Sequence, residues 1–107
     1  MASSFFEDDA MELREAFALA LKAARKAHGL TQEDFGAVSS RTYVSTLERG
    51  GNSPTIEKVQ GLAEIIGIHP LTILAMTYLR IQGGSVEQLF GLVQREIGKI
   101  DQAVGLD

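Results

Sequence analysis

The sequence contains no cysteine, only two prolines, and no long run of apolar residues. Without cysteine the chain can form neither a disulfide nor a thiolate metal site. Without about 20 consecutive apolar residues it has no transmembrane helix. The N-terminus also lacks the basic start and apolar stretch of a secretory signal. We therefore expect a cytoplasmic protein with no membrane partner.

Recognisable catalytic patterns are also missing. The chain shows no nucleophile motif, no glycine-rich loop that would cradle a phosphate, and no cluster of metal ligands. His28 and His69 each lack a second ligand nearby in sequence, so neither is expected to bind a metal. The sequence thus predicts a protein that is not an enzyme and needs neither a metal nor another cofactor.

The chain carries a formal net charge of -4, which by itself disfavours an acidic partner such as nucleic acid. The charges are unevenly distributed, however. Residues 22–49 contain five basic and three acidic side chains, whereas acidic residues gather near both ends. The central segment is therefore able to face phosphates while the ends face away.

The 107 residues, 45% of them hydrophobic, indicate one folded domain with a modest core. Apolar residues recur at helical spacing between glycines, prolines and capping residues, and no period-two alternation predicts a strand. The fold class is therefore all-α. After a flexible arm at 1–8, we predict helices near 9–28, 32–38, 41–49, 56–66, 70–81 and 86–103. The predicted core residues are Leu13, Phe17, Leu21, Ala24, Phe35, Val38, Val44, Leu47, Ile56, Val59, Leu62, Ala63 and Ile66.

Two further features refine this pattern: a glycine inside a predicted helix, and a helix with one polar and one apolar face. Gly36 falls inside a predicted helix, where glycine is unfavourable, and we attribute it to a close helix crossing. The helix at 41–49 has an apolar face, Val44 and Leu47, opposite a polar face free of acid until Glu48. Such a polar face suits the base edges of DNA, and Arg41 could bond a guanine with both arms. Tyr43 either reads DNA or packs at the edge of the core.

The segment Leu30–Ile68 resembles the phage-repressor-like helix-turn-helix family (Cro type, also called the xenobiotic-response-element family). The ordered matches are Gly-Leu-Thr-Gln at 29–32, Gly36, Tyr43-Val44-Ser45, Leu47-Glu48-Arg49-Gly50 and Ser53-Pro54-Thr55-Ile56. The likeness runs from about Leu13 to Leu79. Arg41-Thr42-Tyr43 ahead of Glu48-Arg49-Gly50 is also similar to restriction-modification controller proteins of that family.

The resemblance implies a five-helix repressor-like domain over residues 9–81, followed by an added C-terminal helix. It implies a transcriptional regulator, most simply a repressor, that binds double-stranded DNA as a homodimer at an inverted-repeat operator. It also implies a salt bridge between Arg25 and Glu48 beneath the motif, and a Gln32 that bonds a phosphate and braces the recognition helix. The expected DNA-binding residues are Gln32, Ser39, Ser40, Arg41, Thr42, Tyr43, Ser45, Thr46, Arg49 and Asn52.

The sequence departs from the family between its second and third predicted helices. The family usually has about two more residues there, whereas here Val38 passes through two serines directly into Arg41. We expect a shorter connection to rotate the recognition helix or to shorten its first turn.

The C-terminal helix lies outside the resemblance. Its apolar residues are spaced as a heptad seam, and we expect residues 85–104 to act as a dimerisation element together with the preceding helix. The seam residues are Val86, Phe90, Val93, Ile97 and Ile100, continued by Val104. Two alternatives remain open at this point. The stripe could instead pack inside the domain, and the whole chain could be a protein-interaction module with weak DNA binding.

Overall fold

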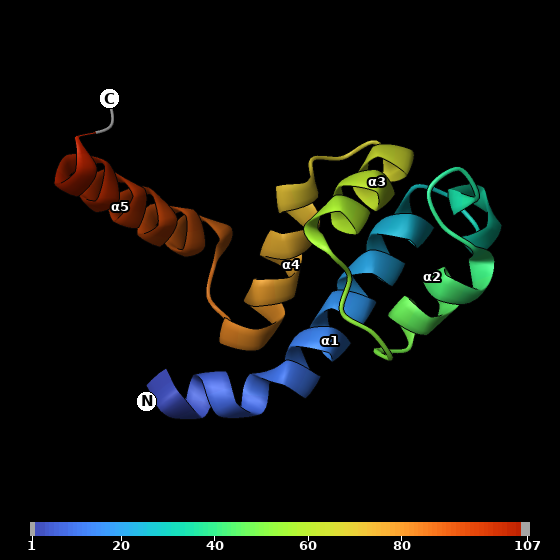
Figure 1. The fold of residues 1–107 in the computed structure, drawn as a ribbon, viewed down its shortest axis with the longest axis horizontal. Coiled ribbons are helices and arrows are strands. Elements are labelled where there is room, and N and C mark those ends of the chain that lie inside the picture. Colours follow the sequence, from blue (N-terminus) through green and yellow to red (C-terminus); the bar gives the residue numbers. More distant parts are fainter. Residues whose placement is uncertain (1, 106–107) are drawn as a thin grey trace.

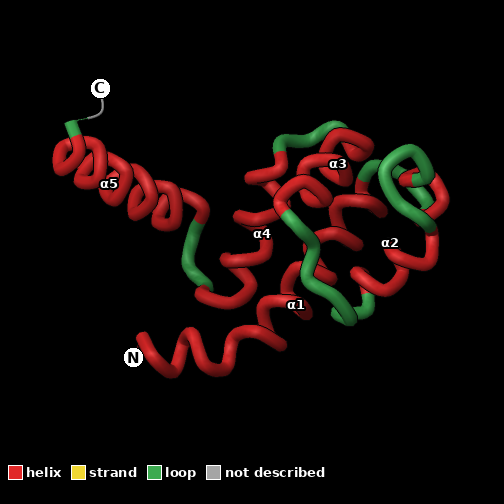
Figure 2. Tube along the Cα trace, in the orientation of Figure 1, coloured by secondary structure: helices red, strands yellow, loops and turns green. Residues whose placement is uncertain are grey.

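The computed structural model describes residues 2–105 of the chain, with side chains described from residue 12 onward. Over that range the chain forms five α-helices, one 3₁₀ turn and no strand, which confirms the all-α prediction (Figure 2). The elements are α1 (Ala2–Ala27), η1 (Gln32–Phe35), α2 (Arg41–Glu48), α3 (Ile56–Ile66), α4 (Pro70–Gln82) and α5 (Val86–Val104).

The N-terminal boundary of α1 differs from the prediction. The helix begins at Ala2, whereas we predicted a flexible arm over residues 1–8 and a helix from Asp9. The side chains of residues 1–11 lie outside the described residues, and the flexibility of this segment stays a prediction. The other end agrees closely, because α1 ends at Ala27 and Gly29 follows with a φ of +70°.

The core forms where α1 packs against α2 and α4, with η1 and α3 closing the remaining side (Figure 1). Its buried residues are Phe17, Ala20, Leu21, Ala24, Phe35, Val44, Leu47, Val59, Leu62, Ala63, Ile66 and Ile73. Leu13 and Val38, both predicted as core, are half-buried. Ile56 is a wrong prediction, since it is 87% exposed. It is the first residue of α3, in a turn that lies beyond the edge of the core.

The second predicted helix, 32–38, is also wrong in type and length. It is a single 3₁₀ turn that ends at the fully buried Phe35. The start of this turn is capped by a hydrogen bond from the Thr31 N–H to the Asp34 carboxylate, at 2.7 Å. The shorter connection between the two helices therefore shortens the first helix of the motif. It does not shorten the first turn of α2, which starts at Arg41 with its cap in place.

No close crossing explains Gly36. The nearest atom to a Cβ built there would be the Glu33 carbonyl oxygen of the same turn, at 3.4 Å. The close approach occurs instead at Gly61 of α3, where a Cβ would lie 3.3 Å from the side chain of Val38. Gly61 thus lets α3 pack against the turn that leads into α2.

Helix α5 departs from the rest of the molecule. It contacts α4 and then runs away from the helical body, on the side opposite α2 (Figure 1). Among the described residues none in α5 is buried. Its heptad residues are between 37% and 60% exposed, so in the single chain the apolar stripe does not pack internally.

Within the described part of the chain, no single helix has the length and apolar character needed to cross a membrane. Helices α3 and α4 reach that threshold only when they are taken together, and they are bent by 107° at their junction.

Candidate nucleic-acid interface

Helix α2 is held at both ends and along one face. Ser40 caps its start by accepting a hydrogen bond from the Tyr43 N–H at 3.0 Å. Gly50 follows its end with a φ of +75°, a conformation that costs an L residue energy and glycine little. Val44 and Leu47 are fully buried and fix the rotation of the helix. The polar face of α2 is therefore presented outward in a set orientation.

The outward face carries hydroxyls and two arginines. Arg41, Thr42 and Arg49 are exposed, while Ser45 and Thr46 are half-buried. The guanidinium of Arg49 donates to the hydroxyl oxygens of Ser45 and Thr46, so it lies along the face rather than away from it. Thr46 in turn donates to the Thr42 carbonyl at 2.9 Å. These groups can bond base edges or phosphates.

Arg41 has one neighbouring acid in the free protein. Its Nε lies 3.8 Å from a carboxylate oxygen of Glu33, and both side chains are largely exposed. An exposed pair of this kind contributes little, typically below about 1 kcal/mol. Arg41 can therefore leave Glu33 for a DNA base at small cost.

Tyr43 packs at the edge of the core, which is one of the two roles considered for it from the sequence. It is half-buried and packs against the core. Lys58 of α3 lies over its ring, with Nζ 5.2 Å from the centroid, and donates to the Val38 carbonyl at 2.7 Å. Lys58 thus ties α3 to the turn and to α2. No local pattern in the sequence marks Lys58 for this role, because the link forms only in space, between residues far apart in the chain.

The remaining predicted residues surround α2. Gln32 is half-buried and donates to Glu48 Oε1 at 3.0 Å, so it braces α2 as the resemblance implies. Ser39 is half-buried in the turn, with its backbone N–H bonded to the Phe35 carbonyl. Asn52 is exposed in the loop between α2 and α3. The structure thus brings the predicted DNA-binding residues to α2 and its two flanking segments.

Arg25 and Glu48 form a bidentate salt bridge beneath this surface. Arg25 Nε lies 2.6 Å from Glu48 Oε2, and Arg25 Nη2 donates to Glu48 Oε1 at 2.9 Å. The third nitrogen donates to the Leu30 carbonyl at 2.8 Å. The side chains are only 10% and 3% exposed. The pair therefore joins α1, the start of the motif and the end of α2.

Burial opposes ionisation of Glu48, but the hydrogen bonds from Arg25 and Gln32 outweigh it, so the pKa of Glu48 is lowered. A lowered pKa in the folded state means that the stabilisation is present above the unfolded value, about 4.3, and is lost as pH falls through the folded value. The stability that Glu48 contributes is therefore lost in acid, not in base.

We expect the difference in free energy of unfolding between the wild type and Glu48→Gln to be full at pH 7 and to shrink steadily below about pH 4.3. The other carboxylates titrate in both proteins, so the difference isolates Glu48. Urea unfolding at a series of pH values measures it. A difference that stayed constant down to about pH 2 would contradict the lowered pKa.

Comparisons with known proteins agree with this geometry. The helix-turn-helix family model matches residues 21–73, which run from α1 through the motif into α4. The chain is 33% identical over 69 residues to the Uncharacterized HTH-type transcriptional regulator y4dJ of Sinorhizobium fredii (strain NBRC 101917 / NGR234). That alignment covers 63% of this chain and 90% of the relative. No solved structure matches the chain.

The matched region contains the elements described above: the η1 turn, the capped α2 and the ion pair that joins α1 to α2. α5 lies outside the residues 21–73 that the family model matches. The chain belongs to the helix-turn-helix family of DNA-binding transcriptional regulators, of the xenobiotic-response-element type.

Proposed function

We propose that the protein is a repressor that binds an inverted-repeat operator as a homodimer, with α2 of each subunit in the major groove. The observation that carries this proposal is the two-sidedness of α2. Its inner face is fixed by Val44, Leu47 and the buried Glu48. Its outer face presents hydroxyls and cations and, over the described residues of α2, no carboxylate. A rigid helix with such an outer face fits base edges flanked by phosphates.

The residue roles follow from position. Arg41, at the first turn of α2, reads a guanine, because the N-terminal residues of a recognition helix reach the base edges. Arg49 and the exposed Asn52 lie at the other end and hold phosphates. Ser45 and Thr46 orient Arg49 through the hydrogen bonds already present in the free protein. Lys58 keeps Tyr43 and the turn in register with α2.

The proposed dimer contact is the surface formed by α4 and α5, with a second copy of this chain as its occupant. The heptad seam of α5 is exposed, and it continues into a groove of about 190 Å³ between α4 and α5. Every residue of the groove is apolar except Tyr78, and the lining is Leu71, Leu74, Ala75, Tyr78, Leu89, Phe90 and Val93. A seam spaced by heptads matches another helix of the same spacing.

Selection of duplexes from a random DNA pool by the purified protein tests the proposal. We expect an inverted repeat with half-sites about 34 Å apart, or a multiple of that distance. Arg41→Ala should lose preference at one position in each half-site, at a cost of about 1–3 kcal/mol in discrimination. Arg95→Ala, which removes an exposed cation on α5, is the control and should keep the full preference.

Salt dependence separates this function from the interaction-module alternative. A protein that neutralises several phosphates loses affinity steeply as salt rises. If the pool shows no enrichment even at low salt, the operator-binding proposal is wrong and the exposed seam of α5 becomes the primary binding surface.

A further inference from the structure

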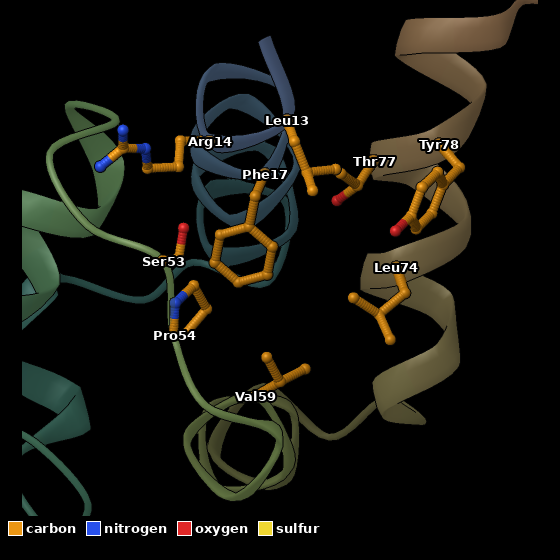
Figure 3. A pocket seen from close by; sticks show the side chains of 9 residues that line it. All are labelled: Leu13, Arg14, Phe17, Ser53, Pro54, Val59, Leu74, Thr77 and Tyr78. Atoms are coloured by element: carbon orange, nitrogen blue, oxygen red, sulfur yellow. The ribbon is translucent and has the colours of Figure 1, made fainter. Parts of the chain in front are cut away.

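A cavity of about 100 Å³, partly open to solvent, lies between α1, α3, α4 and the loop that joins α2 to α3 (Figure 3). Its lining residues are Leu13, Arg14, Phe17, Ser53, Pro54, Val59, Leu74, Thr77 and Tyr78. Native cores contain few voids larger than a water molecule. An unfilled apolar space of this size costs stability, which an occupant of the right shape restores.

The walls specify an apolar body without charge. The ring of Phe17, the pyrrolidine of Pro54 and the branched side chains of Val59 and Leu74 face the space from different elements (Figure 3). Arg14 is the one charged residue of this lining, and its guanidinium points away from the cavity, toward the loop. A charged occupant would lose its hydration without gaining a partner, so the cavity favours a neutral one.

Three lining residues carry a hydroxyl, and two of them, Thr77 and Tyr78, present it from α4. Thr77 is 1% exposed, and its one hydroxyl hydrogen is already donated to the Ile73 carbonyl at 2.8 Å. Its oxygen can therefore only accept a further hydrogen bond. The hydroxyl of Tyr78 lies nearby, on the same side of the space (Figure 3). An occupant that matches this pattern carries a hydrogen-bond donor.

We propose that this cavity is a binding site for a small neutral molecule with an apolar ring or branched chain and one hydroxyl, of which phenol is the simplest aromatic case. An apolar cavity of about 150 Å³ binds benzene. The present space is somewhat smaller but open on one side, so a six-membered ring enters it with one edge at the mouth. The occupant touches Ser53 and Pro54, which follow Asn52 directly, so it reaches the loop beside the DNA-facing surface.

The test uses phenol and benzene with the 107-residue chain and no DNA, so its outcome is independent of the proposed operator binding. We expect phenol to raise the Tm in a dose-dependent way, by at least about 2 °C near saturation. We expect phenol to bind roughly three- to tenfold more tightly than benzene, because benzene lacks the donor. Thr77→Val should remove most of that preference, and since the ratio is taken within one variant, a general loss of stability does not affect it.

A matched pair of substitutions assigns the place of binding. Leu74→Phe fills the cavity and should abolish the effect of phenol on the Tm. Leu71→Phe makes the same change one turn away on α4, outside the cavity, and should leave the effect intact. The proposal is overturned if phenol leaves the Tm and the NMR methyl signals of Val59 and Leu74 unchanged. It is equally overturned if Leu71→Phe blocks binding, whatever the effect of Leu74→Phe, because Leu71 lines only the groove between α4 and α5 and phenol then occupies that groove.

Discussion

Replacing Glu48 by alanine is expected to lower the free energy of unfolding by about 3–5 kcal/mol, because it leaves the buried Arg25 guanidinium without its partner. Arg25 and Glu48 are 10% and 3% exposed, and the carboxylate accepts bonds from both Arg25 and Gln32. The substitution therefore removes three hydrogen bonds that join α1 and the start of the motif to the end of α2. For a domain of this size, the Tm should fall by roughly 10 °C or more.

Glu33→Ala is the matched control. It removes the same side chain from the exposed pair with Arg41, in which the acid is 74% exposed and the separation is 3.8 Å. That loss should cost below about 1 kcal/mol. Thermal and urea unfolding of the two variants give the comparison. Equal melting temperatures would show that the Arg25–Glu48 pair does not hold the motif together.

On the proposed operator binding, the same substitution, Glu33→Ala, should strengthen DNA binding. Glu33 lies beside the proposed base reader Arg41 and is itself an anion near the phosphates. The two acids therefore differ in position: Glu48 joins α2 to α1 from below, whereas Glu33 is exposed beside Arg41, where the proposed operator binding would make it repel DNA. The resemblance already implied the role of Glu48 through its salt bridge with Arg25, whereas no signal in the sequence marked Glu33 as the neighbour of Arg41.

The sequence predicted the helices well wherever capping and periodicity agree. α2, α3 and α5 begin at the predicted residues 41, 56 and 86, and each start directly follows a capping side chain, Ser40, Thr55 or Ser85. Periodicity also placed the buried faces of α2 and α3. It failed at Ile56, because a residue that continues an apolar stripe is buried only if the helix still faces the core at that point.

The second helix of the motif failed for a different reason. Residues 32–38 satisfy a helical pattern, but Phe35 is fully buried and the chain must reach Ser40 in a few residues. Tertiary packing therefore limits the helix to a single 3₁₀ turn. The bond from Lys58 to the Val38 carbonyl and its place over Tyr43 arise from the same packing, and no local signal in the sequence marks them.

Replacing Ile97 by glutamate is expected to weaken operator binding on the order of 100-fold, because it removes the gain from two linked half-sites. Ile97 lies in the middle of the proposed seam and is 53% exposed, so the change should leave the folded monomer intact. In a dimer, however, the carboxylate would be buried against apolar side chains without a partner. Sedimentation should show a shift from dimer to monomer, and titration with the selected operator should show the loss of affinity.

Gln102→Glu is the control, because it adds the same charge to an exposed position on the same helix outside the seam. It should change neither the dimer nor the operator affinity.

The salt dependence of the dimer gives a second test. The positions beside the seam carry the acids Glu87, Glu96 and Asp101, which face like charges in a symmetric pair of these helices. Added salt should therefore strengthen the dimer by screening this repulsion while it weakens DNA binding. A variant truncated after Gly84 that stayed dimeric in sedimentation would place the dimer contact elsewhere, and the heptad seam of α5 would then be free for a different protein.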